Sequence, residues 1–109
     1  MPVNTALESL GAKEAINAAI DLLHRRWVMR IIWELRGGAL TFRELQSACG
    51  DLSPTVLNQR LRELRQAQLI EHAPGDGYGL SEHGQRLLVA MQPMLQWSVR
   101  WWRAAASPD

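Results

Sequence analysis

Apolar residues recur at helical spacing in two consecutive segments near the amino terminus. The first segment, 12–24, has its apolar stripe at Ile16, Ala19, Ile20 and Leu23. The second segment repeats the spacing from Val28 to Leu35 and stops at a glycine pair, 37–38. The pattern therefore predicts two amphipathic helices in succession.

The segment 41–66 predicts two further helices with well-defined starts. Thr41 and Glu44 have the spacing of a capping box. Ser53 and Pro54 suit the cap and the first position of a second helix. The apolar stripe of that second helix is Leu57, Leu61 and Leu64. Two short helices joined by a glycine-containing turn form a helix-turn-helix, whose second member enters the DNA major groove.

The opposite side of the second helix is polar. At about 100° per residue, that side carries Thr55, Gln59, Arg62 and Gln66, with Asn58 and Arg65 on one flank. Side chains of these types donate hydrogen bonds to base edges or phosphates. We therefore expect this side of the helix to face DNA, although a solvated helix face is the equally simple alternative from the helix alone.

A β-hairpin is predicted at 69–80, immediately after the helix-turn-helix. Residues 69–72 and 78–80 have strand character, and the Pro-Gly-Asp-Gly sequence at 74–77 suits a tight turn. A hairpin in this place is a wing. The predicted fold class is thus mainly α with a small β-hairpin, a single winged helix-turn-helix domain over residues 1–109.

A last helix is predicted from the cap residue Ser81 to about residue 105. Pro93 lies inside it and should kink or split it, because proline lacks a backbone donor. More than one of its faces is apolar, so the helix is too hydrophobic to pack only on its own domain. The simplest partner is a second copy of the chain, related by a two-fold axis.

Composition narrows the class of protein. The chain has 109 residues and a net charge of +1, so bulk charge gives little support for nucleic-acid binding, but eleven of its twelve basic residues are arginine. Arginine presents a forked donor pair that suits guanine and phosphate. No run of about 18 apolar residues and no secretory signal is present, so we expect a cytoplasmic protein without a membrane span.

The residues that could carry catalysis are scattered. His24, His72 and His83 lack metal-ligand spacing, and no family-specific signature surrounds the single cysteine, Cys49. No glycine-rich loop lies between a strand and a helix. We expect no enzyme activity, no cofactor and no metal.

Several short motifs occur in a characteristic order between about residues 20 and 97. They are Asp21-Leu22-Leu23 leading to Trp27, Ile32-Trp33-Glu34-Leu35, Phe42-Arg43-Glu44-Leu45, Leu52-Ser53 and Leu57 leading to Leu61-Arg62-Glu63-Leu64, Gln68-Leu69-Ile70-Glu71 and Tyr78-Gly79-Leu80-Ser81-Glu82-His83-Gly84. No single motif is specific, but their order and spacing resemble the HxlR-type winged helix-turn-helix transcriptional regulators of bacteria, which are relatives of the MarR regulators.

The resemblance implies a homodimer that binds double-stranded DNA and regulates nearby genes. Its dimerisation helices would be 12–24 and 81–105. The implied DNA-binding residues are Arg43, Ser53, Thr55, Asn58, Gln59 and Arg62. The candidate dimer-interface residues are Ile16, Ile20, Met94, Trp97, Trp101 and Trp102.

The chain also departs from the family pattern. Glu14 stands where many members have a thiol sensor, so thiol sensing is not supported. Asp76 is the only charged residue of the wing turn, which makes a phosphate-gripping wing doubtful. The glycine pair that many members have before the family tryptophan is His24-Arg25-Arg26 here.

Two questions stay open from sequence. Trp27 and Trp33 are simplest as core residues, whereas the three C-terminal tryptophans suit either dimer packing or a hollow for a flat apolar or aromatic effector. The near-neutral charge also allows an alternative function, a winged-helix module for protein contacts without DNA binding. Salt dependence of binding separates the two functions.

Overall fold

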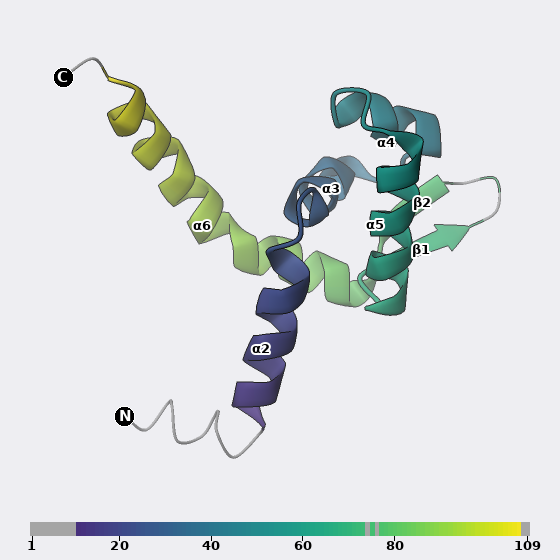
Figure 1. Cartoon of the computed structure of the whole chain (residues 1–109), viewed down its shortest axis with the longest axis horizontal. Coiled ribbons are helices and arrows are strands. Elements are labelled where there is room, and N and C mark those ends of the chain that lie inside the picture. Colours follow the sequence, from purple (N-terminus) through teal and green to yellow (C-terminus); the bar gives the residue numbers. More distant parts are fainter. Residues whose placement is uncertain (1–10, 74, 76, 108–109) are drawn as a thin grey trace.

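The computed structural model describes residues 11–73, 75 and 77–107, and it is mainly helical with one hairpin (Figure 1). Its elements, in chain order, are α2 (Ala12–Leu23), α3 (Val28–Glu34), a 3₁₀ turn (Leu35–Gly37), α4 (Phe42–Ala48), α5 (Pro54–Gln66), β1 (Ile70–Ala73), β2 (Gly77–Leu80) and α6 (Glu82–Ala106). The predicted fold class is confirmed. Pro74 and Asp76 of the wing turn lie outside the described residues, as does the segment before residue 11.

The core lies between α3, α4, α5, the hairpin and the middle of α6. Its fully buried side chains include Val28, Ile31, Ile32, Leu35, Leu45, Leu57, Leu61 and Leu64. The apolar stripes predicted for α3 and α5 are thus buried as expected. Burial of these stripes fixes which side of each helix faces water.

The two early tryptophans are less buried than the sequence suggests. Trp27 is half-buried against the core, and as the cap residue of α3 it has a φ of 79°. Trp33 lies at the edge of the core, where the Arg36 guanidinium covers its ring at 3.6 Å from the centroid. The prediction of a core role is therefore wrong for Trp33, because an arginine rather than an apolar side chain covers one face of the indole.

The wing is an antiparallel pair of strands in which Ile70 faces Leu80 and Ala73 faces Gly77. Leu40, just before α4, bridges to Tyr78 through two backbone hydrogen bonds of 2.9 and 2.7 Å. Gly77 has a φ of 85°, and a Cβ there would meet the Leu40 backbone. The close approach of this third segment therefore requires glycine.

Ser81 joins the wing to α6. Its hydroxyl donates to the Gln68 carbonyl at 2.6 Å and accepts from the Gly84 N–H at 3.1 Å, which confirms the predicted cap. Its backbone N–H donates to the Leu69 carbonyl at 3.0 Å. Ser81 thus forms hydrogen bonds both to the segment that follows α5 and to the first turn of α6.

Helix α6 runs unbroken through Pro93 for 25 residues. It bends rather than splits, as the change of direction along its ribbon shows (Figure 1). Among the described helices none has the length and apolar content needed to cross a membrane.

Helix α2 and the C-terminal half of α6 project away from the helix-turn-helix (Figure 1). The radius of gyration is 16.1 Å, compared with about 13 Å for a compact domain of this length. Only Ala12 is buried along α2, and only Gly84 and Met91 along α6. These helices therefore leave much of their apolar surface uncovered within one chain.

Candidate nucleic-acid interface

The starts of α4 and α5 are fixed by side-chain caps. The Thr41 hydroxyl accepts from the Glu44 N–H at 3.2 Å, and Glu44 accepts from the Thr41 N–H at 2.9 Å, so the predicted capping box is present. The bond from the Thr41 backbone N–H lowers the pKa of the Glu44 carboxyl. The Ser53 hydroxyl accepts from the Val56 N–H at 3.4 Å, and Pro54 opens α5.

The turn between the two helices is equally well defined. Gly50 and Asp51 have φ values of 69° and 58°, so the chain reverses through two left-handed residues. The Gln46 amide donates to the Leu52 carbonyl at 2.9 Å and ties the end of the turn back to α4. These contacts set the angle at which α5 leaves α4.

The polar side of α5 lies at the surface. Thr55, Asn58, Gln59 and Arg62 are exposed, and so are Ser53 at the cap and Arg43 on α4. No part of the described chain covers this side, which is the condition that DNA reading requires. The individual roles of these residues stay predictions.

The arginines of α5 are not equivalent. Arg60 points back to the protein, where its Nε donates to the Arg26 carbonyl at 2.8 Å and its Nη1 to Glu63 at 3.0 Å. Arg62 donates to the Gln59 amide oxygen at 3.3 Å on the exposed side. The outer side of α5 therefore carries less positive charge than the sequence indicates, because the Arg60 guanidinium is bonded to the protein itself.

Glu63 is a functional candidate that the sequence pattern does not single out. It accepts hydrogen bonds from Gln59 and Arg60 and forms a salt bridge with Arg25 at 3.2 Å. Burial tends to raise the pKa of its carboxyl, but the bonds from Gln59 and Arg25 and the nearby arginine charges outweigh that effect and lower it. Its spacing from Gln59, four residues along the helix, is the one local signal that points to it.

On the wing, His72 and Tyr78 stack with ring centroids 4.1 Å apart and an angle of 7° between planes. The two residues face each other in the strand register. His72 is exposed and Tyr78 is half-buried. The described part of the wing thus presents an aromatic pair rather than a basic side chain.

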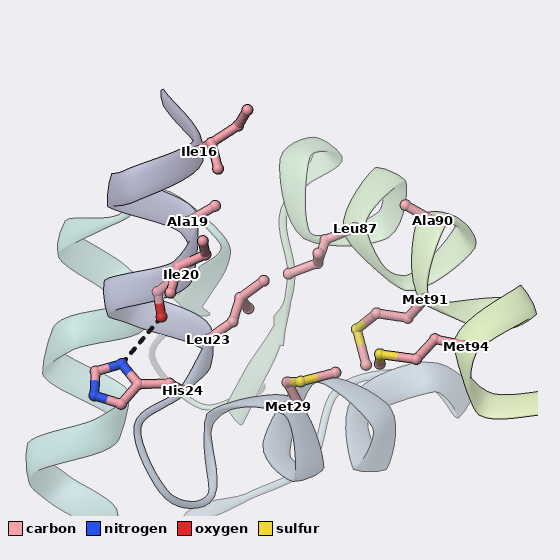
Figure 2. A pocket seen from close by; sticks show the side chains of 10 residues that line it. All are labelled: Ile16, Ala19, Ile20, Leu23, His24, Met29, Leu87, Ala90, Met91 and Met94. Atoms are coloured by element: carbon pink, nitrogen blue, oxygen red, sulfur yellow. Dashed lines mark hydrogen bonds between the residues drawn. The ribbon is translucent and has the colours of Figure 1, made fainter. Parts of the chain in front are cut away.

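The predicted dimer-interface residues divide into two groups. Ile16, Ile20 and Met94 line an apolar groove of about 520 Å³ between α2 and α6, with Met29 and Met91 at its base (Figure 2). The three tryptophans lie farther along α6 and outside this groove. Trp97 and Trp101 stack there at 5.7 Å, with 59% and 51% of each residue exposed.

Cys49 is buried at 2% exposure. Burial first, and then the charge of Glu34, raise the pKa of its thiol. A buried thiol with a raised pKa reacts poorly with electrophiles. Within the described residues, no three His, Cys, Asp or Glu side chains gather as a metal site would need.

Comparison with known proteins places this geometry in a family. The model of the HxlR-like helix-turn-helix family matches residues 22–106. An uncharacterized HTH-type transcriptional regulator of Bacillus subtilis, YvaP, is 32% identical over 76% of this chain and 82% of its own length. The HTH-type transcriptional regulator YodB of the same organism is also 32% identical, over 76% of this chain and 80% of its own.

Solved structures agree with this relationship. Quinone-bound YodB superposes with a TM-score of 0.73 at 31% identity, covering 79% of this chain and 96% of that one. A possible HxlR family transcriptional factor from Thermoplasma volcanium gives a TM-score of 0.72 at 28% identity, covering 77% and 81%. These relatives are regulators rather than enzymes, and they favour DNA binding over a module for protein contacts alone. The chain belongs to the HxlR-like helix-turn-helix family and is a DNA-binding transcriptional regulator.

Proposed function

We propose that the protein acts as a homodimer that recognises an inverted repeat in double-stranded DNA through α5. The observation that carries the proposal is the exposed, donor-rich side of this capped helix. Thr55, Asn58 and Gln59 would read base edges, since asparagine and glutamine suit adenine. Arg62 and Arg43, with Ser53 at the helix start, would hold the phosphates that set register.

The uncovered surfaces of α2 and α6 support the dimer. Ile16 and Ile20 of α2 are about half exposed, and so are Met94 and the tryptophans 97, 101 and 102 of α6. Large aromatic side chains in such places are typical of interface anchors. Two copies joined here would present two α5 helices to successive major grooves, about 34 Å apart on one side of the duplex.

A selection experiment tests the DNA-binding mode. The purified protein is used to enrich duplexes from a randomised pool. The affinity of the protein for the most enriched duplex is then measured by mobility shift at two salt concentrations. We expect an inverted repeat whose affinity falls steeply as salt rises, because phosphate contacts release counterions. Enrichment of no sequence, or a weak salt dependence, would contradict the proposal and favour a protein partner.

A small apolar effector is a second function that one observation favours. The groove between α2 and α6 has a volume of about 520 Å³, which lies within the usual range for ligand pockets. YodB, which shares this fold, has been solved with quinone bound. We propose that a flat apolar or aromatic molecule binds this groove without forming a bond to Cys49.

Titration with 1,4-naphthoquinone tests the effector. Binding should quench tryptophan fluorescence and change DNA affinity, while intact mass spectrometry should detect no thiol adduct, because Cys49 is buried. Ile20→Glu puts a charge into the groove, but Ile20 also lies on the proposed dimer surface, so the oligomeric state of this variant is measured by light scattering. Absence of quenching in a variant that has kept the oligomeric state of the unmodified protein would locate the site in the groove. Quenching that persists unchanged in this variant would place the molecule elsewhere.

A further inference from the structure

One carboxylate connects the reading side of α5 to the turn between α2 and α3. The side chain of Glu63 is only 13% exposed. Its carboxylate accepts hydrogen bonds from the Gln59 Nε2 at 2.9 Å and from the Arg60 Nη1 at 3.0 and 3.1 Å. Arg25 reaches it from the turn at 3.2 Å. Donors therefore approach Glu63 from two elements that are far apart in the sequence.

The position of this carboxylate is itself fixed. Arg60 contacts both of its oxygens and, through Nε, also donates to the Arg26 carbonyl at 2.8 Å. A guanidinium held at both ends leaves its carboxylate partner little freedom. Glu63 is therefore a rigid acceptor placed beside an exposed glutamine.

The amide of Gln59 is oriented by its two neighbours. Its nitrogen donates to Glu63, and its oxygen accepts from the Arg62 Nη1 at 3.3 Å. One N–H and one oxygen lone pair of the amide remain free. That pair complements the N7 acceptor and the N6 donor of adenine.

We propose that Glu63 is a positioning residue that selects which end of the Gln59 amide faces which atom of the base. The inference rests on the proposed reading of bases by Gln59. A charged carboxylate can only accept hydrogen bonds, so it pairs with the nitrogen of the amide and never with its oxygen. A neutral group in its place allows both orientations, and the reversed amide no longer matches adenine.

The test measures base discrimination at single positions. Glu63→Gln keeps the side-chain shape but offers both a donor and an acceptor, so the Gln59 amide can reverse. We expect discrimination at the position read by Gln59 to fall about fivefold or more, which is the lower part of the range for a bidentate contact. Discrimination at other positions should hold. Affinity for an unrelated duplex should stay or rise, because the variant removes a negative charge near the phosphates.

Matched variants separate the alternatives. Glu82→Gln removes another carboxylate, one paired only with Arg86 at the surface, and should leave discrimination unchanged. Glu63→Met gives a second variant in case Glu63→Gln is poorly folded, since methionine has a similar length and only a weakly accepting sulfur. In Gln59→Ala, adding Glu63→Gln should cause no further loss at that position, because the two residues act as one unit.

Three results would overturn the inference in distinguishable ways. If Gln59→Ala lowers discrimination at one position and neither Glu63 variant does, the base reading holds but Glu63 does not position the amide. If Gln59→Ala changes nothing at any position, the proposed reading by Gln59 fails first. A fall in specific and unrelated affinity together, with a lower melting temperature, would assign Glu63 a purely structural role.

Discussion

Helix α5 and the C-terminal half of α6 are both exposed, but they are exposed in opposite ways. The outer side of α5 is polar, and its side chains already bond one another, as Gln59 does with Glu63 and Arg62. The outer half of α6 carries Trp97, Trp101 and Trp102, which no other described element covers. The first surface is stable in water, whereas the second leaves large apolar area in contact with it.

This difference suits the two surfaces to the two different tasks proposed for them. Polar donors can remain hydrated until a nucleic acid replaces the water, so α5 needs no partner to be stable. Removing an indole from water stabilises it by about 25 cal/mol for each Å² of apolar surface that is buried. A lasting contact that covers the tryptophans of α6 is therefore favourable. The comparison therefore predicts constitutive pairing through α6 and reversible binding through α5.

The largest effect is expected from breaking the α6 surface. Trp101→Asp places a charge in an apolar contact and should give a monomer by light scattering. DNA affinity should fall by about 10²-fold or more, because two linked reading helices become one. Gln96→Asp is the control, since Gln96 is also exposed but lies about 100° or more around the helix from each of the three tryptophans. A Trp101→Asp dimer would exclude this interface.

The next largest effect concerns the root of α6, where it meets the wing. A Cβ on Gly84 would collide with the Leu69 carbonyl, so Gly84→Ala should lower the free energy of unfolding by about 2–4 kcal/mol. Chemical denaturation measures this loss. Gly37→Ala, at a glycine with open space around it, should change stability little. Equal stability of the two variants would show that the start of α6 can move away from the Leu69 carbonyl without loss of stability.

A smaller and more selective effect is expected on α5. Gln59→Ala should reduce discrimination at one position in each half-site by about 1–3 kcal/mol, while the dimer and the melting temperature stay as they are. Competition binding with singly substituted duplexes provides the measurement. Uniform weakening on every duplex would instead make Gln59 a backbone contact.

The smallest effect is expected at Arg43. Because Arg43 is proposed to touch phosphate, Arg43→Ala should weaken all sequences alike and reduce the salt slope of log affinity by about 1 for each phosphate that it no longer neutralises. Arg86→Ala, which removes an arginine from α6 that is paired with Glu82, is the matched control. An unchanged slope in Arg43→Ala would remove this residue from the interface.

Local rules were enough to predict most of the fold. The capping box at Thr41 and the cap residues Ser53 and Ser81 mark three helix starts, and the stripe through Leu57 predicts the buried side of α5. Each of these signals spans only a few residues. Their physical basis is therefore visible without knowledge of tertiary contacts.

The features that were missed depend on contacts between distant segments. Arg60 bonds the carbonyl of Arg26, 34 residues away, so no local pattern distinguishes it from Arg62. The contact of Arg36 with the Trp33 ring is local, but the place of Trp33 at the edge of the core depends on how α3 packs and cannot be predicted from the helical spacing. The separation of Met94 from the tryptophans follows from how far α6 extends beyond α2, which the helical period alone does not reveal.

The hydrogen bonds of Ser81 couple the movement of α6 to that of α5. Because Ser81 bonds both to Gln68, just after α5, and to Gly84 in the first turn of α6, a rotation of α6 also moves the end of α5. At 1.5 Å per residue, the 25 residues of α6 span at most about 37 Å, so if α6 turns by about 5° together with the elements packed on it, its far end moves by about 3 Å. In the proposed dimer, a displacement of about 3 Å at the far end of α6 would turn the wing and α5 by only a few degrees. The spacing of the two proposed half-sites would then tolerate small changes in the contact between the two copies.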